Sequence, residues 1–458
     1  TIAFQTDALD DSFNIDFELF PTFGTRLLAK ATLPSSLLVA SHPGSGSKLG
    51  GDLQIPLLDV KLRNTGFLRF NYEIVYPYSG TPLEISLYDT YWKSSSVAEK
   101  KTLKNDIQDN TFQLKKSKHQ NTNVSFVTAS SLTGIYHTVH VYVLNDGTPI
   151  VCPNYLVKVS DNVSLPVCCF NFRQLNDLLY KDTGGYESIC DRLKHMNSHN
   201  GAELHQVLKK LYMPLSMFLD VIDPEFALNL EIFYPSVYEM EFYDIKLFTS
   251  VSSKELIHKC NIEEHLNTST DSCLNNFIDL ILTDIFNHVR TLRHNGNTSR
   301  SRSLILSSDN STVCTILNWK QPNYPVFYNL SGIKLDKRDG KFYECTANGF
   351  SKKDRIVVTR SKKLEEEERT RKINERSNLL IDNIDSINKD SSEYVSSLQY
   401  QDKLSRSTKL ATDFACTNNL LGVTVPRELL QICPKVAQSI RSKGLILVAS
   451  RDQCDIGE

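Results

Sequence analysis

Two histidines in one alternating segment are the first side chains of this sequence that could do chemistry. His137 and His140 lie three residues apart in YHTVHVYVLNDGTPIVCPNY, residues 136–155. The alternation predicts a strand over residues 135–144, and Asn-Asp-Gly at residues 145–147 predicts a turn into a shorter second strand. Because neighbours two apart share a face of a strand, His137 and His140 point to opposite faces and cannot bind one metal ion. A zinc site on this strand is therefore not expected.

The composition is that of an ordinary globular protein. The 458 residues include 51 basic and 53 acidic ones, and 40% are hydrophobic. This length predicts two domains or a large barrel with a smaller domain. A net charge of −2 gives no general attraction to nucleic acid or to an anionic membrane, and no apolar run approaches the roughly 18 residues of a membrane span. The chain begins at Thr1 without a methionine or a leader, so we expect a fragment of a longer protein.

The cysteines indicate a reducing compartment. There are eleven, scattered and odd in number, and the only close pair is Cys168 with Cys169. This pattern favours neither a disulfide framework nor a CxxC zinc site. Six Asn-x-Ser/Thr sequences would be the argument for secretion, but an Asn- and Ser-rich chain produces them by chance. We expect reduced thiols, and a location in the cytoplasm and the nucleus.

Two styles of patterning divide the chain. Residues 1–94 contain short apolar or alternating runs, including Leu37–Ala40, Phe67–Val75 and Leu83–Tyr88, separated by Pro, Gly, Asn and Ser. They predict a compact β-sandwich. Residues 95–123 are polar and rich in lysine, which is typical of a linker or a loop.

Residues 124–458 are predicted to alternate strands and helices. Apolar residues at three- and four-residue spacing from Leu274 to Val289 predict an amphipathic helix. Helices are also predicted over Val313–Trp319, Ala411–Thr417 and Arg427–Arg441, with apolar strands between them. Repeated units of this kind indicate parallel strands covered by helices, either in a closed barrel or in a doubly wound sheet. No GxGxxG sequence supports a dinucleotide site.

One segment interrupts this alternation. Residues 351–405 include SKKLEEEERTRKINERSNLLIDNIDSINKD, in which Glu365 with Arg369 and Glu368 with Lys372 are favourable i,i+4 pairs. They predict an exposed helical insertion. A partner-binding helix is the alternative.

The hairpin at residues 130–155 resembles that of the glycerophosphodiester phosphodiesterase family, a TIM-barrel family. Active members have approximately Y-V-E-F-D-V-Q-L-T-K-D-G-x-P-V-x-x-H-D there. The resemblance implies a divalent metal held by the Glu and the Asp, and a histidine acting as general acid or base on the phosphodiester. Tyr136, Asp146, Gly147 and Pro149 match the family's Tyr, its Asp-Gly turn and its Pro.

The chemical positions of this hairpin do not match. Thr138 occupies the position of the metal-binding Glu, and His140 that of the Asp. Pro153 and Asn154 occupy the positions of the His-Asp pair. The family's H-R-G and E-N-T elements, expected before Leu132, are also missing. The resemblance therefore implies a barrel without catalytic residues, a pseudoenzyme.

Further downstream, LNLEIFYP at residues 228–235 resembles the family's F-N-I-E-I-K-Y-P. Glu231 is retained, and Phe233 replaces the lysine. Glu231 with His140 would supply two ligands, whereas a hard divalent ion takes about six or more oxygens. We therefore expect no metal and no cofactor. Residues 304–330 and 420–450 extend the resemblance, which implies the fold rather than an activity.

The amino-terminal part narrows the resemblance. PTFGTRLLAKATLP (residues 21–34) and residues 55–96 resemble the C2-like β-domain that precedes the barrel in fungal proteins of SPX, ankyrin and phosphodiesterase architecture. One branch contains active glycerophosphocholine phosphodiesterases. The other contains inhibitors of the phosphate-pathway cyclin and cyclin-dependent kinase pair, with a degenerate barrel. TASSLTGIYHTVHVYVLNDGTPIVCPNY (residues 128–155) resembles this second, regulatory branch.

The resemblance implies a C2-like sandwich at residues 1–94, a linker at 95–123, and a degenerate TIM (β/α)8 barrel at 124–458 with the insertion. It implies a non-catalytic scaffold in a kinase inhibitor that signals phosphate starvation and activates phosphate-responsive transcription. The cyclin–kinase complex would be contacted mainly by regions before Thr1. Two alternatives stay open: a phosphodiesterase with relocated catalytic residues, and a barrel that senses a phosphodiester or phosphate without turnover. A calcium site built from Asp7, Asp10, Asp11 and Asp16 is the less favoured alternative to an acidic solvated strand end.

Overall fold

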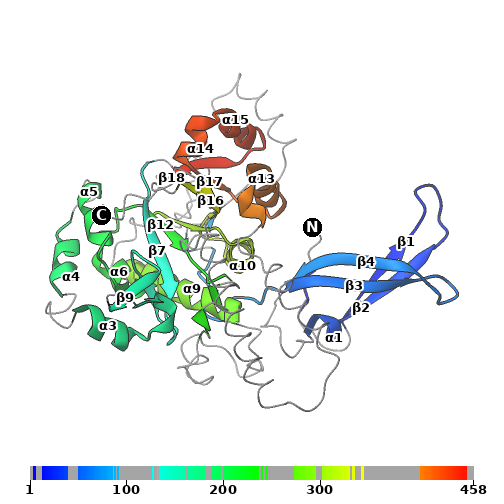
Figure 1. Cartoon of the computed structure of the whole chain (residues 1–458), viewed down its shortest axis with the longest axis horizontal. Coiled ribbons are helices and arrows are strands. Elements are labelled where there is room, and N and C mark those ends of the chain that lie inside the picture. Colours follow the sequence, from blue (N-terminus) through cyan, green and yellow to red (C-terminus); the bar gives the residue numbers. More distant parts are fainter. Residues whose placement is uncertain are drawn as a thin grey trace, which may run out of the picture.

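A computed structural model of the chain, shown in Figure 1, describes two parts, an antiparallel sheet and an α/β sheet with helices. The described residues are 4–6, 13–39, 50–91 without 86 and 89, 126–127, 132, 134–160, 163–180, 187–196, 200–236, 239–240, 243–245, 247, 273–294, 302–330, 333–335, 342–344 and 403–450. The predicted linker and residues 351–402 of the predicted insertion lie outside them. Of the four aspartates of the less favoured calcium alternative, only Asp16 lies inside, where its carboxylate pairs with Lys30 Nζ at 2.8 Å.

The amino-terminal sheet has four antiparallel strands in the order β1-β2-β3-β4. They are β1 (Asn14–Leu19), β2 (Ala29–Pro34), β3 (Gly50–Leu58) and β4 (Asn64–Glu73). A small core of Ala31, Leu33 and Ile55 lies on one face. The predicted all-β character is confirmed, but the predicted strand at Leu37–Ala40 is wrong, because Ser35–Val39 forms the short helix α1.

The segment after β4 packs on the α/β part. The backbone N–H of Tyr76 donates to Asn275 Oδ1 at 3.1 Å, and Tyr78 Oη lies 2.8 Å from Thr283 Oγ1. Leu83, only 3% exposed, belongs to the same core as the helices. The strand predicted at Leu83–Tyr88 is wrong, because a turn occupies this range, with Leu87 and Tyr88 N–H both donating to Glu84 O. Within this run Leu83 is buried in the main core, whereas Ile85 and Leu87 are exposed.

The α/β part is organised around an eight-stranded sheet in the order β11-β8-β7-β12-β13-β14-β17-β18. Pairing is parallel from β7 through to β18, and β8 and β11 add antiparallel strands beyond β7. The bounds are β7 (His137–Val143), β8 (Pro149–Val151), β11 (Met213–Pro214), β12 (Leu228–Ile232), β13 (Leu304–Ser308), β14 (Val326–Asn329), β17 (Gly422–Pro426) and β18 (Ile446–Ser450). In Figure 1 these strands occupy the middle of the α/β part, and the β1–β4 sheet extends away from it.

Helices connect the parallel strands. The principal ones are α3 (Phe172–Tyr180), α4 (Glu187–Lys194), α5 (Gly201–Leu208), α6 (Leu215–Val221), α9 (Cys273–His294), α10 (Ser311–Lys320), α13 (Thr408–Thr417), α14 (Arg427–Ile432) and α15 (Lys435–Ser442). The single helix predicted at Arg427–Arg441 is wrong, because Pro434 cannot continue α14 and the chain restarts as α15. Among the described helices, none combines the length and the apolar character needed to cross a bilayer. Parallel strands with covering helices confirm the predicted α/β class.

The remaining elements are short. They are β5 (Thr90–Tyr91) paired with β6 (Phe126–Val127), β9 (Leu156–Ser160) paired with β10 (Val163–Pro166), β15 (Ile333–Leu335) paired with β16 (Phe342–Glu344), and the 3-10 turns η1 (Val167–Cys169) and η3 (Lys403–Arg406).

The two faces of the sheet are lined by different layers. Val139, Val141 and Val143 of β7 join the main core with the helices. On the other face, Tyr136 packs with Ile305, Phe327 and Leu421 in a separate apolar cluster. The alternation predicted for this strand is thus confirmed. Layers of inward-pointing side chains from successive strands are typical of barrel interiors, and the polar residues described next form the layers above this cluster.

Candidate functional site at the carboxyl ends of the strands

The strand register brings His140 and Glu231 side by side. Glu231 of β12 is opposite His140 of β7 and, on its other side, opposite Ser307 of β13. His140 Nε2 lies 3.4 Å from Glu231 Oε2, and the two side chains are 13% and 20% exposed. Both lie toward the carboxyl ends of parallel strands, the end at which α/β barrels place their active sites.

Glu231 also has a partner on β14, two strands further along the sheet. Asn329 Nδ2, at the end of β14, donates to Glu231 Oε1 at 2.9 Å and lies 3.2 Å from Ser307 Oγ. The carboxylate therefore has one oxygen facing an imidazole and the other accepting from an amide. Asn329 Oδ1 is buried and has no hydrogen-bond partner.

A second polar layer lies below this one. Ser307 Oγ lies 2.8 Å from Asn229 Oδ1, and Asn229 Nδ2 lies 3.5 Å from Thr138 Oγ1. Asn229 and Ser307 are buried. The six residues Thr138, His140, Asn229, Glu231, Ser307 and Asn329 form one set of contacts across four strands, here called the inner polar network. It satisfies polar groups that would otherwise be buried without partners.

The remaining predicted positions, Phe233, Pro153 and Asn154, differ in their relation to His140. The ring of Phe233 contacts the His140 ring edge to face, with centroids 5.0 Å apart, and stacks on Tyr142 at 5.0 Å. Pro153 and Asn154 follow β8, where Cys152 N–H donates to His140 O at 3.3 Å. Asn154 is exposed. The structure therefore brings Glu231 and Phe233 into contact with His140, joins Thr138 to the same network through Asn229, and leaves Asn154 exposed.

The chemistry available to this arrangement is limited. Among the described residues, no group of three or more His, Cys, Asp or Glu side chains is placed to hold a metal ion. Glu231 and His140 alone would make an incomplete site for a hard cation. Burial raises the pKa of Tyr142, with Cys152, Glu231, Glu239 and Asp309 adding to the effect. Tyr142 is therefore neutral at physiological pH and acts as packing beside His140.

His137 lies on the opposite face, as predicted. Its ring contacts Phe226 at 5.5 Å and His205 at 5.4 Å between centroids. It is 8% exposed, and its Nδ1 has no hydrogen-bond partner. His137 and His140 therefore point to opposite faces of β7, as expected, so their imidazoles cannot bind one metal ion.

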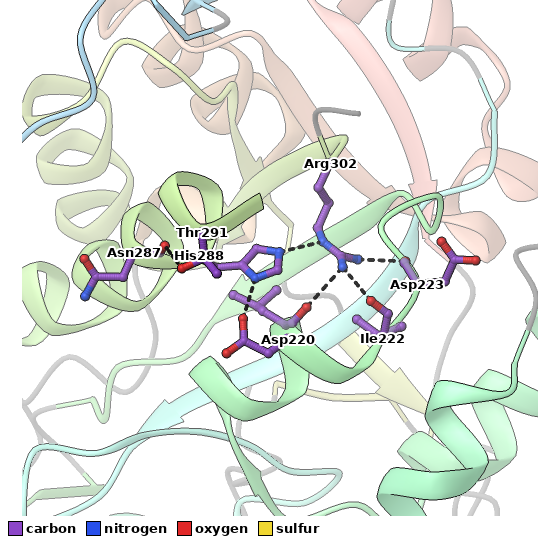
Figure 2. Close-up of polar contacts among 8 residues, drawn as sticks. Asp220, Ile222, Asp223, Asn287, His288, Thr291 and Arg302 are labelled. Carbon is purple, nitrogen blue, oxygen red and sulfur yellow. Dashed lines mark hydrogen bonds and ion pairs between the residues drawn. The ribbon is translucent and has the colours of Figure 1, made fainter. Parts of the chain in front are cut away.

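A second polar cluster, which sequence reasoning missed, lies at the amino ends of the strands (Figure 2). Arg302 precedes β13 and is 4% exposed. Its guanidinium donates to the carbonyl oxygens of Leu219, Ile222 and Asp223 at 3.1, 2.7 and 3.1 Å. These carbonyls lie at the carboxyl end of α6, where unpaired C=O groups favour a cation.

The guanidinium also fixes the orientation of a histidine. Arg302 Nε donates to His288 Nε2 at 3.3 Å, so His288 carries its proton on Nδ1 and donates to Asp220 Oδ1 at 2.8 Å. Asp220 is 58% exposed and His288 is 3% exposed at their side chains. No spacing signal connects residues 220, 288 and 302 in the sequence. Their position at the amino ends of the strands indicates a role in stability.

Comparison with known proteins finds one match to the amino-terminal part of the chain and others that extend over almost all of it. A family model described as a GDE1-like C2 domain matches residues 1–79. Phosphate system positive regulatory protein PHO81 of Saccharomyces cerevisiae is 32% identical over 456 residues, which are 99% of this chain and 31% of that protein. Ankyrin repeat protein nuc-2 of Neurospora crassa is 27% identical over 449 residues, 98% of this chain and 35% of that protein. The chain is a relative of these two fungal proteins.

The chain spans about a third of the length of these two relatives. A more distant match, Glycerophosphocholine phosphodiesterase GDE1 of Candida albicans, is 25% identical over 349 residues, 69% of this chain and 28% of that protein. A solved glycerophosphodiester phosphodiesterase of Thermotoga maritima covers 70% of this chain and 74% of its own, with 10% identity and a TM-score of 0.26. The matches to PHO81 and nuc-2 confirm the predicted resemblance to the regulatory branch.

The buried histidines of this PHO81 relative predict a pH dependence of stability. Burial lowers the pKa of His288 despite its bond to Asp220, and burial together with His205 lowers the pKa of His137. The folded state then binds fewer protons than the unfolded chain, so stability is complete above about pH 6.5 and is lost as the pH falls toward the folded pKa values. We expect a lower free energy of unfolding at pH 5.5 than at pH 7.5, by at most about 1.4 kcal/mol per pH unit per histidine. A lower urea midpoint at pH 5.5 would report this difference. His288→Gln should reduce this difference, and an unchanged pH dependence in that variant would contradict the assignment.

Proposed function

We propose that this chain is a non-catalytic regulatory segment of a fungal phosphate-signalling protein that inhibits a cyclin–cyclin-dependent kinase complex. In this proposal it works in the cytoplasm and the nucleus, and the kinase complex is contacted mainly by regions before Thr1. Relatedness to PHO81, whose name is phosphate system positive regulatory protein, supports the signalling role.

The observation that carries the non-catalytic part is the engagement of Glu231. Its two carboxylate oxygens face His140 at 3.4 Å and Asn329 at 2.9 Å. A metal-dependent phosphodiesterase needs convergent oxygens on its ion and a proton donor for the leaving group. Thr138 and Pro153, which take the places of a family ligand and the family acid/base, offer neither a carboxylate nor an imidazole. The inner polar network therefore supports a structural role at this end of the sheet.

The second candidate is glycerophosphodiester binding or hydrolysis. Glu231 is retained and partly exposed, and the match to a glycerophosphocholine phosphodiesterase supports this alternative. Asp309, directly after β13, adds to the electrostatic field at Tyr142 together with Glu231. These carboxylates are the residues on which such an activity would depend.

We expect no turnover of glycerophosphocholine by the purified chain. The chain would be incubated with this substrate and Mg²⁺ or Ca²⁺, and released choline would be measured against a blank, with the Candida albicans relative as positive control. Glu231→Ala should leave the background unchanged. Choline release that is lost in Glu231→Ala would overturn the non-catalytic assignment. Calorimetric binding of the same substrate without release would favour the ligand-sensing alternative.

The regulatory part is tested in cells. Removing the segment that corresponds to this chain from the full-length protein should reduce phosphate-responsive transcription during phosphate starvation. The full-length Glu231→Gln protein should respond normally, because its amide oxygen can still accept from Asn329 and the proposed role does not use the carboxylate chemically. Normal induction after removal of the whole segment would contradict a regulatory function here.

A further inference from the structure

The adjacent cysteines Cys168 and Cys169 lie at a structurally defined turn. They end the 3-10 turn η1, between β10 and α3. Cys168 is 3% exposed and lies 3.9 Å from Tyr155 Oη, whereas Cys169 is half-buried. A buried cysteine and a partly exposed one therefore follow each other in the same turn.

We propose that Cys168 and Cys169 form a redox-modification site, in which a hydroperoxide oxidises Cys169 and Cys168 then converts the product into a disulfide between the two residues. This inference is independent of the proposed function. Neither residue belongs to the inner polar network.

The order of the two steps follows from the environment of each thiol. Donation from Cys168 lowers the pKa of Cys169, and the bond to Cys169 with burial raises the pKa of Cys168. Because the thiolate is the nucleophile and Cys169 is also the more exposed of the two, Cys169 reacts first. Among the other described cysteines, Cys416 and Cys433 are exposed but have no adjacent cysteine. They lack a resolving thiol in the next position along the chain.

The reaction balances with hydrogen peroxide as the oxidant. The Cys169 thiolate attacks one peroxide oxygen, the O–O bond breaks, and the leaving hydroxide takes up a proton to give water and a sulfenic acid. The Cys168 sulfur then attacks the Cys169 sulfur, the S–O bond breaks, and the Cys168 proton leaves with the hydroxide as a second water. The dithiol loses two electrons and the peroxide gains them.

The product is expected to be easily reduced. Neighbouring Cα atoms are about 3.8 Å apart across a trans peptide, whereas most disulfides join Cα atoms about 4.4–6.8 Å apart. Closing this bond forces the turn away from its present geometry. Strained disulfides have more oxidising potentials and are the labile ones. Thioredoxin-type reductants should therefore restore the dithiol.

Oxidation of the two cysteines would affect the contacts of the β7–β8 hairpin, which carries His140. The carbonyl of Phe170 accepts from Asn145 N–H at 2.9 Å, and Phe172 N–H donates to Asp146 Oδ2 at 2.8 Å. These bonds join the residues directly after η1 to the turn between β7 and β8. A distorted η1 should weaken both and expose the turn amides to exchange.

The experiment uses the intact chain and hydrogen peroxide. Trypsin cleavage after Lys158 and Arg173 yields peptide 159–173, whose only cysteines are Cys168 and Cys169. We expect this peptide to lose two hydrogen atoms and to regain them with thioredoxin. In Cys168→Ala, the sulfenic acid should persist on Cys169 and react with dimedone. In Cys169→Ala, Cys168 should stay unmodified.

Two further measurements keep the test decisive if a variant folds poorly. In the wild-type chain, limiting iodoacetamide at pH 7 should label Cys169 several-fold faster than exposed Cys416. Deuterium uptake at residues 145–147 should rise after oxidation and return after reduction, whereas Cys416→Ser should behave as wild type in both. Labelling of Cys416 before Cys169, or an oxidised peptide carrying only sulfonic acids, would overturn the proposal.

Discussion

Replacing Lys320 with methionine should destabilise this protein by roughly 3–5 kcal/mol, because it leaves a carboxylate buried without its cation. Lys320 Nζ lies 2.7 Å from Asp279 Oδ1, and the two side chains are 0% and 3% exposed. Burial raises the pKa of Asp279, and Lys320 opposes this rise. Removal of the ammonium would oblige Asp279 either to take up a proton or to remain charged in an apolar core, and both cost free energy.

The effect should extend to the segment after β4. Lys320 Nζ also donates to Pro77 O at 3.3 Å, and Ser79 N–H donates to Asp279 Oδ2 at 3.2 Å. The ion pair therefore joins α9, α10 and residues 77–79, which are 200 or more positions away in the sequence. In Lys320→Met, deuterium exchange at residues 76–83 should increase before the global unfolding transition.

The controls for this prediction come from the chain itself. Lys443→Met removes the partner of Asp413 in an exposed ion pair and should change the urea midpoint little, since exposed pairs contribute little. Asp279→Asn combined with Lys320→Met should recover a large part of the loss, because neither charge is then left alone. A Lys320→Met protein as stable as the Lys443→Met protein would show that Asp279 is already neutral in the folded state.

The sequence predicted the elements well wherever one periodicity governs a segment. On α9, the apolar positions Phe277, Ile278, Ile281 and Ile285 are all buried, as the helical spacing indicated. On β7, alternate residues separate into the helix-packed core and the inner face. Patterns of this kind reflect burial of one face of one element, which is a local property.

The sequence could not predict which polar groups meet. Asp279 lies on the same helix as the predicted apolar stripe, and nothing local shows that Lys320 and Ser79 will enclose it. The same holds for Asn329, whose contact with Glu231 depends on the order of β12, β13 and β14 in the sheet. The wrong predictions at Leu37–Ala40 and Leu83–Tyr88 arose because a short apolar run fits a strand, a helix turn or a buried turn equally well.

Arg302 is the residue at which a single substitution should combine several losses. Arg302→Met would remove the donor to three buried carbonyls and to His288 Nε2. Burial lowers the pKa of Arg302 to about 10, so the side chain is still charged at pH 7. Each unsatisfied buried acceptor costs about 1–3 kcal/mol before relaxation. Since water can reach part of the site through exposed Asp220, we expect a net loss of roughly 3–5 kcal/mol.

Arg302→Lys distinguishes charge from geometry at this position. A planar guanidinium donates to His288 on one side and to the carboxyl end of α6 on the other, and an ammonium cannot reproduce that fork. Arg302→Lys should therefore recover only a minor part of the loss, and Arg173→Met, at an exposed arginine, should be close to wild type. Urea unfolding followed by circular dichroism measures all three, and deuterium exchange should increase first at residues 215–223 in Arg302→Met. If Arg302→Lys is as stable as wild type, the positive charge at the end of α6 matters and the fork geometry does not.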